Sequence, residues 1–439
     1  MPVSRPSPAD AAVHRFVNKT VDFRFRGEDF RFHLSHALFS SFDIDDGTRL
    51  LLKSIAQKVD LAALGSVLDV GCGVGVIGAC VGRHAPDARV VMQDRDALAV
   101  EVARWNCRQN KLDRVSVDCR LAFHGLGGGS FDLVASNIPA KAGAPVLKAF
   151  FRHAAGCLSP RGIAAVVIVA PLAATARDAI SALGCQVLHT EESNAYSVFH
   201  FAAGSAPRET DAAREDLAPY VRASASFFRG QRTCILETAH SLPDFDTLGH
   251  DIELALDVLE ILPGDRSVLF WNPGQGHLPA AAALSLALPG PALPGPAAPG
   301  PAAPGPAAPG PAAPGPAAPP SVAIASRDCL ECAITSRNLT RIGVPPASIH
   351  CVGSEAEIGG IVPPDSVDLL IAVPHPVPRV PWQADLAGSA MRVLKPGGRL
   401  LAVGTSTEIH RLLAQAGKLM PAEGKKRQGF RAVLLKKAP

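Results

Sequence analysis

The sequence lacks the features that would tie it to a membrane, an export route or a metal ion. No apolar run reaches the roughly 18 residues that a membrane-spanning helix requires. The opening residues, M-P-V-S-R-P-S-P, contain no signal-peptide core. The ten cysteines include one C-x-x-C motif, Cys329 to Cys332, with no second pair at zinc spacing. We therefore expect a cytoplasmic protein with reduced thiols, no membrane partner and no metal.

Net charge is also nearly absent, and it decides little about partners. The chain has 439 residues and a formal charge of +3, which argues neither for nor against a nucleic-acid partner. Its length exceeds what one hydrophobic core usually serves, so two domains are expected.

The most informative segment lies in the first half, where residues 67–78 read V-L-D-V-G-C-G-V-G-V-I-G. An apolar run followed by closely spaced glycines and helix-compatible residues is typical of the first strand, turn and helix of a nucleotide-binding α/β domain. Gly71, Gly73 and Gly75 have no Cβ, so their backbone N–H groups can approach a ligand closely. These glycines form the predicted cofactor-binding loop.

Four polar residues accompany the loop, each near the carboxyl end of an expected strand: Asp69, Asp94, Asp118 and Asn137. Ligands of open α/β sheets bind outside the carboxyl ends of the strands, so these side chains should meet at one site. Asp69 precedes Gly71 by two residues and is expected inside the turn, where a carboxylate would repel a pyrophosphate and attract a cationic or zwitterionic ligand. Asp94, at the tip of its strand, is placed to accept both hydroxyls of a ribose.

At these residues the sequence resembles the class I S-adenosylmethionine-dependent methyltransferases, and among them the tandem-domain ribosomal RNA guanine methyltransferases. The similarity includes A-L-F-S-S-F-D-I-D-D-G-T-R-L-L-L at residues 37–52 and covers residues 22–200 well. The resemblance implies S-adenosylmethionine as the cofactor. The glycine loop would hold it, with Asp69 at its amino-acid end, Asp94 at its ribose, Asp118 near its adenine amine, and Asn137 beside it.

The resemblance also assigns the methyl-accepting side of the site. Enzymes with an Asn-Pro-Pro-aromatic motif use the Asn side chain and a following backbone carbonyl to accept hydrogen bonds from the two N–H groups of an amine, while the ring stacks on the substrate. Here Asn137, Ile138 and Pro139 occupy the motif and are the predicted catalytic residues. Ala140 stands where the ring is expected, which removes a stacking contact worth about 1–3 kcal/mol per base.

Each assigned side chain also has a purely structural interpretation. Asn137 could cap a strand turn, Asp69 could be a plain turn acid, and Asp118 could be an ordinary surface acid. Asp96 competes with Asp94 for the ribose contact.

Two segments upstream of the loop have clearer structural than functional signals. D-D-G-T-R should begin a helix with Asp45 or Asp46 as its cap, although Thr48 borders the cofactor in the resembled family. The stretch 21–32 interleaves Arg with Phe, which could contact phosphates and bases. We prefer a β-hairpin with buried Phe and exposed Arg.

The second half of the chain repeats the first. Short matches recur in the same order, among them Phe42-Asp43 with Phe245-Asp246 and Arg95-Asp96 with Arg327-Asp328. We therefore predict an α/β protein of two tandem Rossmann-like class I methyltransferase domains, each a mostly parallel sheet flanked by helices.

The second copy has lost the residues that carry the predicted site. Gly274 and Gly276 remain from the glycine loop. The positions that match Asp69, Gly71, Gly78, Asp94 and Asn137 are occupied, in that order, by Phe270, Asn272, Pro279, Ser326 and Val373. We predict a cofactor-binding catalytic domain at 1–204 and a degenerate domain at 205–439 that helps to dock the substrate. Within the latter, P-G-P-A-A repeats at 289–320 cannot bury a core and should form a solvated insert.

These patterns predict a methyltransferase that acts on an amino nitrogen, with a guanine exocyclic amine in ribosomal RNA as the preferred acceptor. Ala140 keeps a small molecule or a protein side chain open as the acceptor. A non-catalytic scaffold that binds RNA or protein is the alternative from another class. Asp69 and Asp94 argue against a scaffold, because it would have no physical need of them. The sequence does not indicate an oligomeric state.

Overall fold

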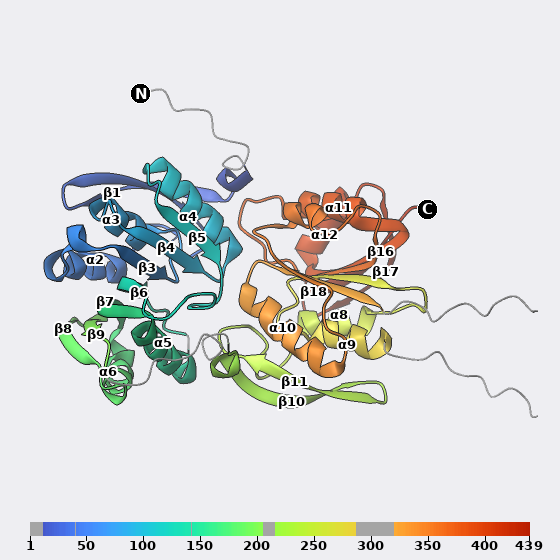
Figure 1. Cartoon of the computed structure of the whole chain (residues 1–439). Helices are drawn as coiled ribbons and strands as arrows, with labels where there is room; N and C mark the ends of the chain where they lie inside the picture. The colour runs from blue at the N-terminus through green and yellow to red at the C-terminus, as the bar shows by residue number, and fades with distance from the viewer. Residues whose placement is uncertain (1–11, 40, 142, 205–215, 287–319) are drawn as a thin grey trace, which may run out of the picture.

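The computed structural model describes residues 12–39, 41–141, 143–204, 216–286 and 320–439. Within these ranges the chain forms two seven-stranded sheets and two separate two-stranded hairpins (Figure 1). The predicted insert lies outside the described residues except for its last position, Pro320, and the proposed boundary at 204/205 borders a range that is not described.

The first sheet has the strand order β5-β4-β3-β6-β7-β9-β8. Its strands are β3 (Ser66–Val70), β4 (Arg89–Asp94), β5 (Val115–Cys119), β6 (Phe131–Asn137), β7 (Leu158–Val169), β8 (Gln186–Glu192) and β9 (Tyr196–Ala202). Neighbouring strands are parallel, except that β9 runs antiparallel to β7 and β8. The chain order reverses between β3 and β6, which is the switch point where ligands bind in such sheets.

Helices and one hairpin cover this sheet. The helices are α2 (Asp46–Lys58), α3 (Val76–His84), α4 (Ala97–Gln109), α5 (Ala144–Cys157) and α6 (Ala173–Ala182). Strands β1 (Val17–Phe25) and β2 (Glu28–Ser35) form the hairpin. Phe25, Phe30 and Phe32 are buried in the core, whereas Arg24 and Arg31 are exposed. The preferred interpretation of the Arg/Phe segment, a hairpin with buried rings, is confirmed.

The second sheet has the order β14-β13-β12-β15-β16-β18-β17, which repeats the connectivity of the first. Its strands are β12 (Ser267–Trp271), β13 (Ser321–Ser326), β14 (Ser348–Cys351), β15 (Val367–Ala372), β16 (Leu394–Thr405), β17 (Leu419–Arg427) and β18 (Phe430–Lys437). A hairpin of β10 (Val221–Arg229) and β11 (Arg232–Ala239) precedes it. The helices are α8 (His250–Val258), α9 (His277–Leu286), α10 (Cys329–Ile342), α11 (Trp382–Val393) and α12 (Ser406–Gln415). The predicted fold class is confirmed.

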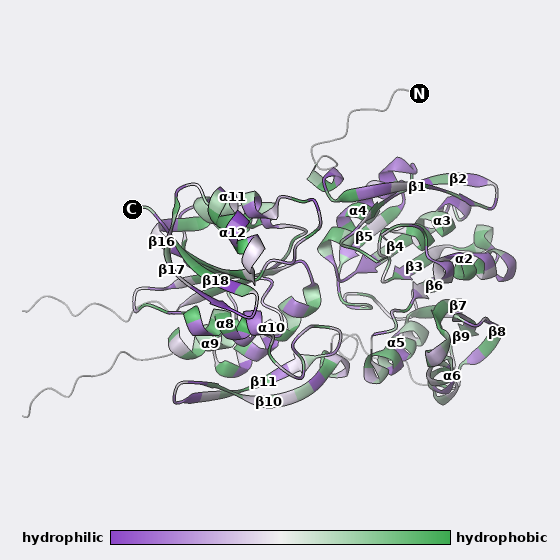
Figure 2. Cartoon of the chain, turned by 180° about the vertical axis from the view of Figure 1, so that it is seen from behind, coloured by the Kyte–Doolittle hydropathy of each residue, from purple (hydrophilic) through white to green (hydrophobic). Residues whose placement is uncertain are grey.

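The central strands are buried on both faces, as parallel strands covered by helices must be. In Figure 2 they are coloured as hydrophobic, while the surrounding helices alternate between polar and apolar residues. In β3, for example, Val67, Leu68 and Val70 are all buried. Among the described residues, no helix combines the length and apolar character needed to cross a bilayer.

The two halves meet at equivalent loops, one after β4 and one after β13. An isolated antiparallel bridge joins Asp96 to Asp328. Arg327 pairs with Asp96 at 2.7 Å, and Arg95 pairs with Asp328 at 3.2 Å. The contact is reciprocal, because each copy contributes the same Arg-Asp dipeptide. In Figure 1 the hairpins β1–β2 and β10–β11 lie at opposite ends of the two halves, which agrees with two copies that face each other through the same loop.

Candidate active site

Four neighbouring strands bring the predicted polar residues to one edge of the first sheet. Asp69 lies in β3, Asp94 in β4, Asp118 in β5 and Asn137 in β6. These strands are adjacent in the order β5-β4-β3-β6, and all four run parallel. Their carboxyl ends therefore lie side by side, as the sequence predicts.

The glycine loop adopts a backbone that few other residues could follow. Gly71, Gly73 and Gly75 have φ values of +68°, +55° and +87°, a region that L-residues rarely occupy. A methyl group at Gly71 or Gly73 would meet no atom within 4 Å, so both face open space. At Gly75 the same methyl would lie 3.1 Å from Ala103 of α4. The loop therefore packs on one side and leaves a ligand free access on the other.

Asp69 is more buried than the sequence predicts. We expected it in the turn, but it lies within β3 and is fully buried. Its Oδ2 accepts a hydrogen bond of 2.8 Å from the N–H of Gly78, where a Cβ would collide with Met92. Its Oδ1 is buried and has no partner within the described part of the chain. Burial raises the pKa of Asp69 to about 7, against the hydrogen bond from Gly78.

Asp94 fastens the glycine loop to the end of β4. It accepts hydrogen bonds from the N–H of Gly73 at 2.8 Å and of Asp96 at 2.9 Å. Burial raises the pKa of Asp94, and these two N–H groups oppose the shift. A carboxylate offers about four lone-pair positions, so two remain for ligand hydroxyls.

Asp96 is committed elsewhere. It caps α4 through the N–H of Leu98, at 2.9 Å, and it pairs with Arg327. Asp94 therefore remains the better candidate for the ribose contact, which stays a prediction.

Asn137 is held by two residues from the start of α2. Its Nδ2 donates to Asp45 Oδ1 at 3.0 Å and to Thr48 Oγ1 at 3.1 Å. An ionised carboxylate only accepts hydrogen bonds, so the NH₂ end of the amide must face Asp45. The Oδ1 end consequently points away from Asp45 and can accept a hydrogen bond from a substrate amine.

The sequence predicts Asp45 or Asp46 as the cap of α2, and the structure has Asp45 in that role, with a hydrogen bond of 3.1 Å from the N–H of Thr48. Its contact with Asn137 was missed, because the two residues lie 92 positions apart. The remaining motif residues continue the chain from β6. The N–H of Ile138 donates to Val167 O at 2.9 Å, which orients the peptide, while Pro139 and Ala140 are exposed.

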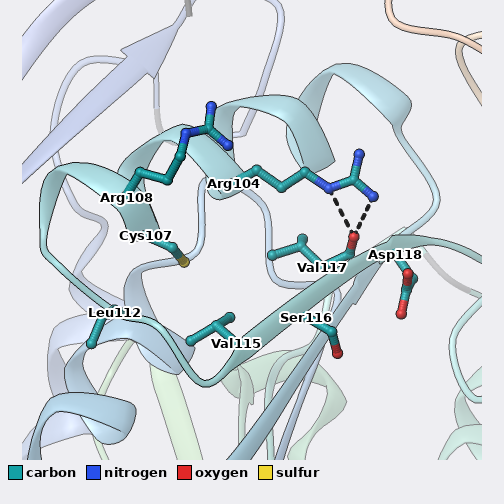
Figure 3. A pocket seen from close by; sticks show the side chains of 8 residues that line it. All are labelled: Arg104, Cys107, Arg108, Leu112, Val115, Ser116, Val117 and Asp118. Atoms are coloured by element: carbon teal, nitrogen blue, oxygen red, sulfur yellow. Dashed lines mark hydrogen bonds between the residues drawn. The ribbon is translucent and has the colours of Figure 1, made fainter. Parts of the chain in front are cut away.

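Asp118 lies beside a shallow pocket at the edge of the sheet (Figure 3). The pocket has a volume of about 360 Å³ and is lined by α4, by β5 and by Leu112 between them: Arg104, Cys107, Arg108, Leu112, Val115, Ser116, Val117 and Asp118. The Arg104 guanidinium donates to Val117 O. Asp118 falls within β5 rather than after it. The other predicted site residues do not line this pocket, so the adenine role of Asp118 stays a prediction.

The equivalent region of the second copy is filled by its own side chains. Phe270, in place of Asp69, is buried. Glu331 on α10, where the first copy has Ala99, is buried and accepts hydrogen bonds from Ser326 Oγ at 2.9 Å and from the N–H of Gly274 at 3.3 Å. In the first copy the equivalent N–H of Gly73 binds Asp94, so Glu331 takes over this contact where Ser326 has replaced that acid, and Phe270 leaves no counterpart of Asp69.

Thiols do not contribute a second kind of chemistry to the site. Burial and the nearby carboxylates raise the pKa of the Cys72 thiol, within the glycine loop, well above its ordinary value. Cys329 and Cys332 are buried on α10. Within the described ranges, no three His, Cys, Asp or Glu side chains are arranged to hold a metal ion.

Comparison with known proteins relates the first half to methyltransferases. Residues 29–200 match the family model described as methyltransferase small domain. A ribosomal RNA small subunit methyltransferase C of Haemophilus influenzae (strain PittGG) is 41% identical over 102 residues, which make up 23% of this chain and 29% of that protein. The chain thus matches under a third of that relative's length. The uncharacterized protein YbxB of Bacillus subtilis (strain 168) is 32% identical over 151 residues, 34% of this chain and 74% of that protein.

A solved structure resembles the whole chain. The 16S rRNA N2 G1207 methyltransferase of T. thermophilus, in complex with AdoMet and guanosine, superimposes with a TM-score of 0.62. The match covers 96% of this chain and 99% of that one at 14% sequence identity. At this identity the likeness establishes a shared fold, including the tandem arrangement.

Proposed function

The chain belongs to the methyltransferase small domain family, and we propose that it transfers a methyl group from S-adenosylmethionine to an amino nitrogen, with a guanine exocyclic amine of ribosomal RNA as the acceptor. The observation that carries the proposal is Asn137, fixed by Asp45 and Thr48 beside a loop of glycines and acids. The names of the relative from H. influenzae and of the solved structure support the acceptor class. Such a substrate implies a cytoplasmic location.

The residues of the first copy fit this cofactor. Gly71 and Gly73 face open space, and the buried Oδ1 of Asp69 lacks a partner among the described residues. An ammonium group would satisfy that oxygen and favour the ionised carboxylate. Asp94 would take the ribose hydroxyls and Asp118 the adenine amine. Bound S-adenosylmethionine would supply a methyl group already activated on a sulfonium.

The protein's own contribution is to position the acceptor. Asn137 Oδ1 would accept a hydrogen bond from one N–H of the substrate amine and the Ile138 carbonyl a hydrogen bond from the other, which points the nitrogen lone pair toward the cofactor. The proton that the methylated nitrogen gives up would pass to water. Pro139 restricts the backbone φ of this turn. No side chain has to act as a strong nucleophile, because holding two reactants in line accounts for much of the rate gain.

Isothermal titration with S-adenosylhomocysteine tests the cofactor assignment. We expect one binding event per chain, because Glu331 and Phe270 fill the second copy. No heat of binding at millimolar ligand would contradict the proposal, and two events per chain would contradict the assignment of a single site.

Ala140 keeps two other kinds of acceptor open. Without a ring in the motif, a small molecule or a protein side chain could receive the methyl group. Incubating the purified protein and labelled S-adenosylmethionine with RNA, protein and metabolite fractions of a deletion strain separates these acceptors. Label in ribosomal RNA supports the proposal, whereas label confined to another fraction contradicts it.

A further inference from the structure

The substrate side of the site has no ring in the motif, but rings are exposed nearby. Ala140 is exposed and carries only a methyl group. In the loop between β2 and α2, Phe39 and Phe42 are 73% and 66% exposed, among the most exposed large apolar side chains of the described residues. Exposing such rings to water is unfavourable, and both belong to the segment that leads to Asp45.

Phe42 lies close to the residue that accepts the substrate. It precedes Asp45 by three residues, and Asp45 is hydrogen-bonded to Asn137. Three residues span at most about 11 Å of extended chain. Phe42 therefore lies in the segment next to the residue that holds Asn137, and we take its ring to border the site.

The backbone of this loop is fixed by the first strand. Lys19 Nζ donates to Phe42 O at 2.6 Å, and Asn18 Nδ2 donates to Ser41 O at 2.9 Å. The ring touches His36 in an edge-on arrangement with centroids 5.1 Å apart, which leaves a face open. A ring held in this way loses little conformational entropy when a base stacks on it.

The second copy shows what happens to the same ring where no site remains. Phe245, which matches Phe42, is only 37% exposed. The Arg222 guanidinium lies 4.3 Å from its centroid and is held by Asp246. Arg222 is the extra residue of a β-bulge at which the first copy has Asn18. The degenerate copy therefore covers its ring, and the copy with the site leaves it open.

We propose that Phe42 supplies the aromatic surface on which the acceptor base stacks, in place of the ring that the motif lacks at Ala140. The inference rests on the proposed function, because the occupant is the base whose amine Asn137 accepts. It adds a binding residue outside the motif and selects planar heteroaromatic acceptors over aliphatic ones.

Fluorescence of a single-stranded RNA hexamer that contains one 2-aminopurine tests this inference. The analogue carries a 2-amino group, as guanine does, and its emission falls when it stacks. We expect quenching by the wild type, and loss of quenching with a roughly 5- to 100-fold higher Kd in Phe42→Ala. Phe42→Trp should retain both the quenching and the affinity, whereas Phe42→Leu, which is apolar without a π face, should retain neither.

Matched controls separate stacking from general apolar contact and from failure of the proposed function. Phe228, which is 69% exposed on the second copy, should tolerate replacement by Ala. Unchanged quenching and affinity in Phe42→Ala would overturn the inference, as would a loss seen in Phe39→Ala instead. S-adenosylhomocysteine should bind wild type and Phe42→Ala equally. If it binds neither, the proposed function fails, and the RNA titration still decides the role of Phe42.

Discussion

At the scale of single residues, the buried acid in β3 is the most informative group. A carboxylate with a raised pKa in the folded state stabilises the fold while it is protonated. For Asp69 this contribution is complete below the ordinary value of 3.8 and is lost as the pH rises through about 7. Ionisation of Asp69 at neutral pH therefore destabilises the ligand-free protein, and an ammonium group of the cofactor would offset this destabilisation.

This linkage predicts the pH dependence of ligand binding. If the ligand needs ionised Asp69, its binding releases a proton below pH 7. The affinity for S-adenosylhomocysteine should then rise by up to about tenfold per pH unit below that value and level off above it. Titrations between pH 5.5 and 8.5 measure this. In Asp69→Asn the affinity should be lower and almost independent of pH, and a wild-type profile in that variant would contradict the assignment.

A pair of equivalent residues tests which copy holds the ligand. Asp94→Ala should weaken S-adenosylhomocysteine binding by about 1–3 kcal/mol, because hydrogen bonds to a charged group are lost. Ser326→Ala, at the matching position of the second copy, should leave binding unchanged, since Ser326 contacts Glu331 and Asn272. Calorimetry on both variants makes the comparison. Equal losses of binding free energy would contradict the assignment of the site to the first copy.

At the scale of single elements, the amino terminus of α2 serves both stability and the site. Asp45 caps the helix through the N–H of Thr48, and the same side chain binds Asn137. The helix is thereby positioned against the end of β6, so the local capping rule and the substrate-binding geometry use one carboxylate.

Removal of this cap should therefore affect both properties. We expect Asp45→Ala to cost about 0.5–2 kcal/mol of stability and to lower kcat more than it raises KM, because Asn137 loses its orientation. The matched control is Thr405→Ala, which removes the capping box of α12 in the second copy. Thermal unfolding and methyl-transfer kinetics should show a similar stability loss in both variants but an activity loss only in Asp45→Ala.

The elements themselves were largely predictable, and the contacts between them were not. Apolar runs and glycines sufficed to identify β3, β4, β6 and the carboxyl edge where the site lies. The placement of Asp69 in a turn was wrong, because a fully buried acid within an apolar strand contradicts the usual pattern. The contacts of Asn137 with Asp45, and of Glu331 with Gly274, join separate elements, and no local periodicity encodes them.

At the scale of the whole molecule, two tandem copies share an interface next to the site. Asp96 contacts the second copy and also donates its N–H to Asp94, so the docking surface and the glycine loop are joined through one turn. The pair of Arg327 and Asp96 is mostly shielded, with 18% and 23% of the two side chains exposed. Shielded pairs resist screening by salt better than exposed ones do.

A double-mutant cycle measures this coupling between the copies. Arg327→Met keeps the apolar stem, and Asp96→Asn keeps the ability to cap α4. We expect a coupling free energy of about 0.5–3 kcal/mol from denaturant unfolding. The exposed pair of Arg31 and Asp22, at 2.9 Å, serves as the control and should give a much smaller coupling free energy, because solvent screens both charges. Equal values for both pairs would contradict a structural role for the shielded one.

The reciprocal Arg-Asp contact has the pattern of an isologous interface, in which each partner presents the same patch to the other. In a homodimer built this way, every amino-acid change would appear in both subunits at once, so one subunit could not lose its ligand-binding cleft while the other kept it. Covalent fusion removes that constraint. One half can then fill its cleft with Glu331 and keep the shared patch, while the other stays free to bind.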